Sequence, residues 1–107
     1  MNGIKFSSNR LEGFDPKDLR GLVDEYKSKM GTGVAVVVTT VEGRASIAVG
    51  VTDDLTGRFS AVDLVRAGVE ALGGKGGGGR PDMAQGGGPD GAKAEEAIAA
   101  VKAILAG

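Results

Sequence analysis

The residues of this chain that could do chemistry gather in one glycine-rich stretch, residues 73–91. Among its glycines stand Lys75, Arg80, Asp82 and Gln85. Glycine loses more backbone freedom on folding than any other residue, so clustered glycines indicate that bare main chain is needed there, for an unusual conformation or for close approach by another molecule. A passive linker typically mixes glycine with serine and carries few fixed charges. We therefore interpret the stretch as an ordered functional loop.

The chemistry that this loop favours is the binding of an anion or of a nucleic-acid backbone. Lys75 would supply a point charge, Arg80 a bidentate fork for phosphate, and Gln85 a polar contact to sugar or base. Close approach of the main chain, with N–H groups facing phosphate oxygens, would come from Gly76, Gly77, Gly78 and Gly79. Such contacts position a structured RNA without reading its bases. In the alternative interpretation, Arg80 pairs with Asp82 and the loop packs against the rest of the domain.

Composition excludes most hydrolytic and metal-centred chemistry. The chain has no cysteine and no histidine, which removes disulfides, thiol catalysis, serine–histidine triads and zinc sites built on these residues. Lys75 is followed by glycine rather than by Ser or Thr, so the stretch is not a nucleotide-binding P-loop. The adjacent acids Asp53 and Asp54 are more typical of a solvated turn than of a magnesium site. We expect no catalytic residue, metal or cofactor in this chain.

The size and charge of the chain predict a single domain, residues 1–107. It carries 13 basic and 14 acidic side chains, a net charge of −1, so any contact with nucleic acid must come from local placement of cations. No apolar run approaches the roughly 20 residues that span a bilayer, and the start of the chain lacks a secretory pattern. We expect no membrane association and a cytoplasmic protein.

The elements around the loop follow from hydrophobic periodicity. We expect strands at 3–11, 34–41 and 44–51, and helices from Asp15 to Met30, from Ser60 to Leu72 and from Pro89 to Leu105. The run 34–41 is apolar and β-branched on both faces, which indicates an interior strand, and it should form an antiparallel hairpin with 44–51. The helix between the first two strands makes them parallel. The predicted fold is α/β, a small mixed β-sheet with helices packed on it, in the order β-α-β-β-α-Gly loop-α.

The run GGKGGGGRPDMAQGGG, residues 73–88, resembles the glycine-rich signature of the DHH-associated C-Ala domain near the C-terminus of alanyl-tRNA synthetases. The likeness covers nearly the whole chain, because the elements come in the family's order. The resemblance implies a non-catalytic, tRNA-binding C-terminal domain that contacts the outer corner of tRNA and helps aminoacylation and editing act on the same tRNA. It also implies contacts with the other domains of the parent, an ATP-dependent alanine–tRNA ligase in which ATP, magnesium and zinc are held elsewhere.

Two alternatives belong to other classes. The first is the nucleic-acid-gripping accessory domain of a DHH-type phosphoesterase, whose glycine run ends in histidine. Here Arg80, Pro81 and Asp82 follow the glycines and histidine is absent, so the key residue of that family is missing. The second is a homo-oligomerisation module, in which the glycine surface or the exposed side of Ala92–Leu105 forms a homodimer.

Overall fold

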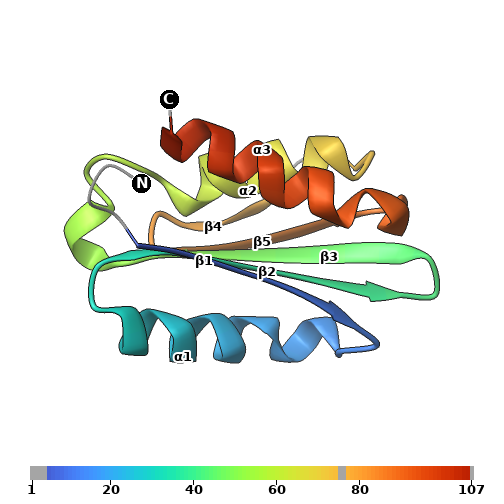
Figure 1. Cartoon of the computed structure of the whole chain (residues 1–107), viewed down its shortest axis with the longest axis horizontal. Helices are drawn as coiled ribbons and strands as arrows, with labels where there is room; N and C mark the ends of the chain where they lie inside the picture. The colour runs from blue at the N-terminus through green and yellow to red at the C-terminus, as the bar shows by residue number, and fades with distance from the viewer. Residues whose placement is uncertain (1–4, 75–76, 107) are drawn as a thin grey trace.

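A five-stranded mixed sheet forms the centre of the computed structural model, which describes residues 5–74 and 77–106 (Figure 1). Its strand order is β1-β2-β3-β5-β4. The strands are β1 (Lys5–Glu12), β2 (Gly33–Val41), β3 (Arg44–Val51), β4 (Gly78–Arg80) and β5 (Met83–Gly88). One helix, α1 (Leu19–Met30), covers one face of the sheet, while α2 (Ala61–Ala71) and α3 (Ala94–Ala106) lie side by side on the other. The predicted α/β class with helices packed on a mixed sheet is confirmed.

The first three strands have the predicted pairing. β1 runs parallel to β2 because α1 carries the chain back across the sheet, and β2 pairs antiparallel with β3. Glu42 and Gly43 make the hairpin turn with φ angles of 51° and 81°, the left-handed conformation that a two-residue hairpin turn favours. The residues of β2 from Val34 to Val38 are all fully buried, since helices cover both faces of this interior strand.

Alternating residues of the strands point to opposite faces of the sheet and belong to two separate hydrophobic cores. Toward α1, Leu19 and Val23 pack on Ala35, Val37 and Ala48. The larger core lies on the opposite face, where the apolar sides of α2 and α3 meet the other residues of the strands; its fully buried members include Ile47, Leu64, Leu72, Val36, Val49 and Val65. Packing on both faces fixes the register of the sheet, because a slip by one residue would exchange the two cores.

The prediction of a loop over residues 73–91 is wrong for its inner part. Residues 78–80 and 83–88 form β4 and β5, and β5 pairs antiparallel with β3 along its length, from Gly50↔Met83 to Ala45↔Gly88. Glycine is normally depleted in strands because it has no side chain to pack. Here the missing side chains are what allow the strands to approach the end of α2: a Cβ on Gly88 would lie 2.5 Å from the Leu72 carbonyl oxygen.

Of the polar residues Asp15 and Ser60, at which two helices were expected to begin, Asp15 makes a side-chain cap bond and Ser60 does not. Asp15 accepts a hydrogen bond from the Lys17 N–H (3.0 Å) and precedes a short 3-10 turn, Pro16–Asp18, that leads into α1. Ser60 makes no side-chain cap bond at the start of α2. Instead, the Ala61 N–H donates to the Pro81 carbonyl (2.8 Å), so the turn between β4 and β5 caps this helix. In the part of the chain that the structure describes, no helix has the length and apolarity that crossing a membrane requires.

Candidate nucleic-acid interface

The glycine-rich hairpin of β4 and β5 forms one edge of the sheet, with β4 outermost. Its glycines differ in what surrounds them. A Cβ on Gly79 would meet the Met83 carbonyl oxygen and would lie 2.7 Å from Ala84 Cα, and φ of Gly79 is +148°. A Cβ on Gly77 would lie 3.0 Å from Val65 Cγ1, whereas at Gly78 no atom of the described residues comes within 4 Å. Packing within the described part of the chain therefore accounts for Gly77 and Gly79 but not for Gly78.

The other predicted contact residues lie in different surroundings. Arg80 ends β4, and its side chain is 71% exposed. Gln85 is half-buried on β5, where its Nε2 donates to the Pro16 carbonyl oxygen (3.0 Å) and ties β5 to the turn before α1. The side-chain amide of Gln85 thus makes a hydrogen bond within the domain, which the sequence did not suggest. Lys75 and Gly76 lie outside the described residues.

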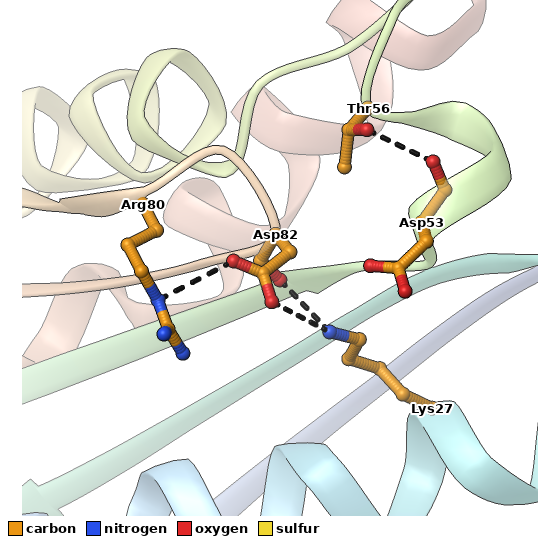
Figure 2. Close-up of polar contacts among 5 residues, drawn as sticks. All are labelled: Lys27, Asp53, Thr56, Arg80 and Asp82. Atoms are coloured by element: carbon orange, nitrogen blue, oxygen red, sulfur yellow. Dashed lines mark hydrogen bonds and ion pairs between the residues drawn. The ribbon is translucent and has the colours of Figure 1, made fainter.

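Asp82 is the centre of a polar cluster beside Arg80 (Figure 2). Its Oδ1 lies 3.5 Å from Arg80 Nε, the ion pair that the alternative interpretation anticipated. Its Oδ2 lies 3.7 Å from Lys27 Nζ, and the same ammonium donates to the Asp82 carbonyl oxygen at 3.1 Å. The Lys27 side chain is 14% exposed, so α1 contributes a largely buried cation to the turn between β4 and β5.

Three elements besides the hairpin hold this turn in place. The Pro81 carbonyl accepts from the first N–H of α2, and the Asp82 carbonyl accepts from Val51 N–H at the end of β3 (2.9 Å). Lys27 adds α1 to the set. Arg80 is therefore presented by a loop fixed on a rigid scaffold, the arrangement in which binding residues are commonly found.

Comparison with known proteins identifies the family of this chain. The family described as the DHHA1 domain matches residues 3–107. This chain belongs to the DHHA1 domain family.

Two relatives of this DHHA1 domain are named alanine–tRNA ligases. The chain is 64% identical over 104 residues to the ligase of Rhizorhabdus wittichii and 63% identical over 106 residues to that of Sphingopyxis alaskensis. These alignments cover 97% and 99% of the chain, which spans 12% of the length of each relative.

The fold is similar to that in the crystal structure of the C-Ala domain from Aquifex aeolicus alanyl-tRNA synthetase. The TM-score is 0.91 at 30% sequence identity, covering 98% of this chain and 94% of that one. The C-Ala resemblance inferred from the glycine signature is confirmed.

Lys27 is the functional candidate that sequence reasoning missed in this DHHA1 domain. It lies four residues after the buried Val23, at the border of the apolar side of α1, and a lysine at such a border is ordinary in an amphipathic helix. The one signal in the sequence is Gly50, a glycine within the apolar strand β3, since an isolated glycine in a strand often marks close approach by another group. A Cβ on Gly50 would meet Val23 Cγ1 and would lie 2.6 Å from Lys27 Cδ, so the lysine stem lies against the sheet where that glycine leaves room.

Two hollows border the hairpin of the DHHA1 domain. One, of about 530 Å³, lies beside the start of β3 and includes Arg44 and Ser46 in its wall. The other, of about 470 Å³, lies between the end of α1 and the turn before α2, and its wall includes Lys27, Asp54 and Asp82.

Hydrogen bonds with two threonines hold Asp54 in the second hollow. Side-chain hydrogen bonds with Thr52 and, second, Thr32 lower the pKa of Asp54 below its ordinary 3.8. The Thr32 hydroxyl donates to Asp54 Oδ2 at 2.7 Å. Within residues 5–74 and 77–106, no three acidic side chains gather closely enough to hold a metal ion.

Proposed function

We propose that this DHHA1 domain is a non-catalytic, tRNA-binding module of an alanine–tRNA ligase. It contacts the outer corner of tRNA and so helps aminoacylation and editing act on the same molecule. Its partners are tRNA and the other domains of the ligase, which places it in the cytoplasm. ATP, magnesium and zinc belong to the parent enzyme and are not held by this domain.

The observation that carries the proposal is the exposed Arg80 at a bare sheet edge. Its ion pair with Asp82 is formed by Nε, and Figure 2 shows the two terminal nitrogens farther from that carboxylate. The terminal nitrogens are the fork that grips a phosphate with two parallel hydrogen bonds. At Gly78, two residues away, no atom within residues 5–74 and 77–106 lies within 4 Å of a Cβ position, which favours approach of a phosphate backbone to the main chain there. Because the relatives are named alanine–tRNA ligases, we propose tRNA as the polyanion that binds here.

A binding experiment with the 107-residue chain tests this proposal. Replacing Lys75 and Arg80 together by Ala should weaken binding to a tRNA transcript and reduce the log–log salt slope by about one unit for each phosphate that these side chains neutralise. The matched control is Arg10→Ala on β1, at the opposite edge of the sheet. Arg10 is also exposed and also pairs with an acid, Glu95 (3.3 Å), so this variant loses the same kind of group away from the hairpin.

The control separates local contact from bulk charge. The account predicts a reduced slope in the double variant and an unchanged slope in Arg10→Ala. Equal affinity and slope in the folded double variant and the unaltered chain would show that the hairpin does not contact tRNA.

An exposed apolar side on α3 favours a second candidate function, self-association. Ile104 is 42% exposed, and its neighbours Ala103 and Ala106 are also exposed. A homodimer through this face would bury them. Mass measured in solution over a range of chain concentrations, with and without tRNA, separates the two functions: self-association raises the mass with concentration in the absence of tRNA, and a purely tRNA-binding module stays monomeric.

A further inference from the structure

We propose that Asp82 is a positioning residue for tRNA, which holds the Arg80 guanidinium in the orientation that engages a phosphate. The inference rests on the proposed function. It gives a role to an acid whose negative charge, considered alone, should repel a polyanion.

The atoms that form the ion pair support this role. A guanidinium can meet a carboxylate through its terminal nitrogens or through Nε. Arg80 uses Nε, at 3.5 Å from Asp82 Oδ1. The terminal nitrogens lie beyond it, away from Asp82 (Figure 2). Asp82 therefore restrains the side chain without occupying the fork that binds phosphate.

Asp82 can restrain Arg80 because it is itself held at several atoms. Its Oδ2 lies 3.7 Å from Lys27 Nζ, and its carbonyl oxygen accepts from both Lys27 Nζ (3.1 Å) and Val51 N–H (2.9 Å). The Asp82 side chain is 32% exposed, against 71% for Arg80, so the acid is the more fixed partner of the pair. Lys27 also compensates its charge: the three ionised groups together carry a charge of +1.

An exposed arginine loses rotamer freedom when it binds a phosphate, and this loss opposes binding. A partner that holds Nε in advance removes part of that loss before tRNA arrives. The gain opposes the repulsion between the Asp82 carboxylate and the phosphate. Restraint of Arg80 strengthens tRNA binding and repulsion weakens it. Whether removal of the Asp82 carboxylate lowers or raises tRNA affinity therefore decides which effect is the larger.

Three variants of the 107-residue chain test the inference by binding to an unmodified tRNA transcript at low salt. Asp82→Ala should weaken binding on the order of threefold, the scale of an exposed ion pair, although it removes a negative charge. Asp82→Asn keeps an acceptor oxygen and should bind within about twofold of the unaltered chain. In an Arg80→Ala background, Asp82→Ala should cause no further loss, because no guanidinium remains to be positioned.

Thermal unfolding of each variant shows whether the fold survives. If Asp82→Ala binds as tightly as the unaltered chain or tighter while Arg80→Ala weakens binding, Asp82 acts only by its charge and the positioning role is overturned. Should Asp82→Ala fail to fold, Asp82→Asn decides: binding more than about twofold tighter than the unaltered chain would likewise overturn the positioning role. An Arg80→Ala variant with unchanged affinity overturns both this inference and the role of Arg80 in the proposed function.

Discussion

Adjacent glycines of β4 should respond in opposite directions to the same substitution. Gly78 and Gly79 are both exposed members of a three-residue edge strand. An added methyl group at Gly78 meets no atom within 4 Å in the part of the chain that the structure describes. At Gly79 it meets main-chain atoms of the paired strand β5, 2.7 Å from Ala84 Cα, in a backbone conformation, φ +148°, that side chains rarely adopt.

The surroundings of the two glycines set the expected difference between the variants in the free energy of unfolding. Strained backbone of this kind costs about 1–3 kcal/mol, and overpacking against atoms that cannot move aside adds an amount of similar size. We therefore expect Gly79→Ala to lower the free energy of unfolding by about 3 kcal/mol. Gly78→Ala should raise it by about 0.5 kcal/mol, because alanine restricts the unfolded chain without straining the folded one.

Urea unfolding of the two variants measures the difference directly. With a slope near 1.5 kcal/mol/M, a gap of about 3.5 kcal/mol separates their midpoints by roughly 2 M. A domain of this size has about 5–15 kcal/mol of stability, so both variants should still fold. Equal midpoints would refute the claim that contact with β5, rather than an external ligand, requires glycine at position 79.

Further experiments test the rest of the sheet and its surroundings. Thr39→Val removes the buried hydroxyl that bonds both the N–H and the carbonyl of Phe14, so the free energy of unfolding in urea should fall by about 1–3 kcal/mol, and no change would contradict this. A Cβ on Gly68 would lie 2.5 Å from Ile47 Cδ1, so Gly68→Ala should cost about 1–3 kcal/mol but clearly less in an Ile47→Val background, where that atom is absent. Strict additivity in this double-mutant cycle would rule out the contact. Hydrogen bonding lowers the pKa of the Asp54 carboxyl. The contribution of the ionised carboxylate to stability should therefore be complete above pH 3.8 and should be lost as the pH falls through the lowered pKa. A carboxyl NMR titration of Asp54 with its midpoint at or above 3.8 would contradict this.

Much of the fold could be predicted from the sequence because its signals are local. The apolar, β-branched run of β2 indicates a strand buried on both faces, and Glu42-Gly43 indicates the turn of a hairpin. The amphipathic spacing of α1, from Leu19 to Met30, likewise predicts a helix on one side of the sheet. In each case the pattern and the packing depend on the same few neighbouring residues.

The two glycine strands could not be predicted in this way. A strand is recognised by alternating side chains, and the six residues of β5 include three glycines, which have none to alternate. What makes β5 a strand is its long-range pairing with β3, and what makes glycine suitable is the closeness of the end of α2. Neither the pairing with β3 nor the contact with α2 can be recognised from the residues of β5 alone.

The surroundings of the candidate site were beyond the sequence for the same reason. Lys27 and Asp82 are 55 positions apart, and Gln85 reaches Pro16 across 69. Exposure of Arg80 and its pairing with Asp82 were both anticipated, as alternatives. The structure shows that they occur together, because the pair uses Nε.

The most direct test of the central claim is to map the amides of the 107-residue chain that change when tRNA is added. In NMR spectra recorded during a titration with a tRNA transcript, we expect the amide shifts to concentrate around β4 and the turn after it, at residues 77–80 and Asp82, with smaller changes at Lys27. The amides of β1 at the opposite edge of the sheet should stay unchanged. Perturbations confined to β1 or to α3, with the hairpin unaffected, would contradict the account.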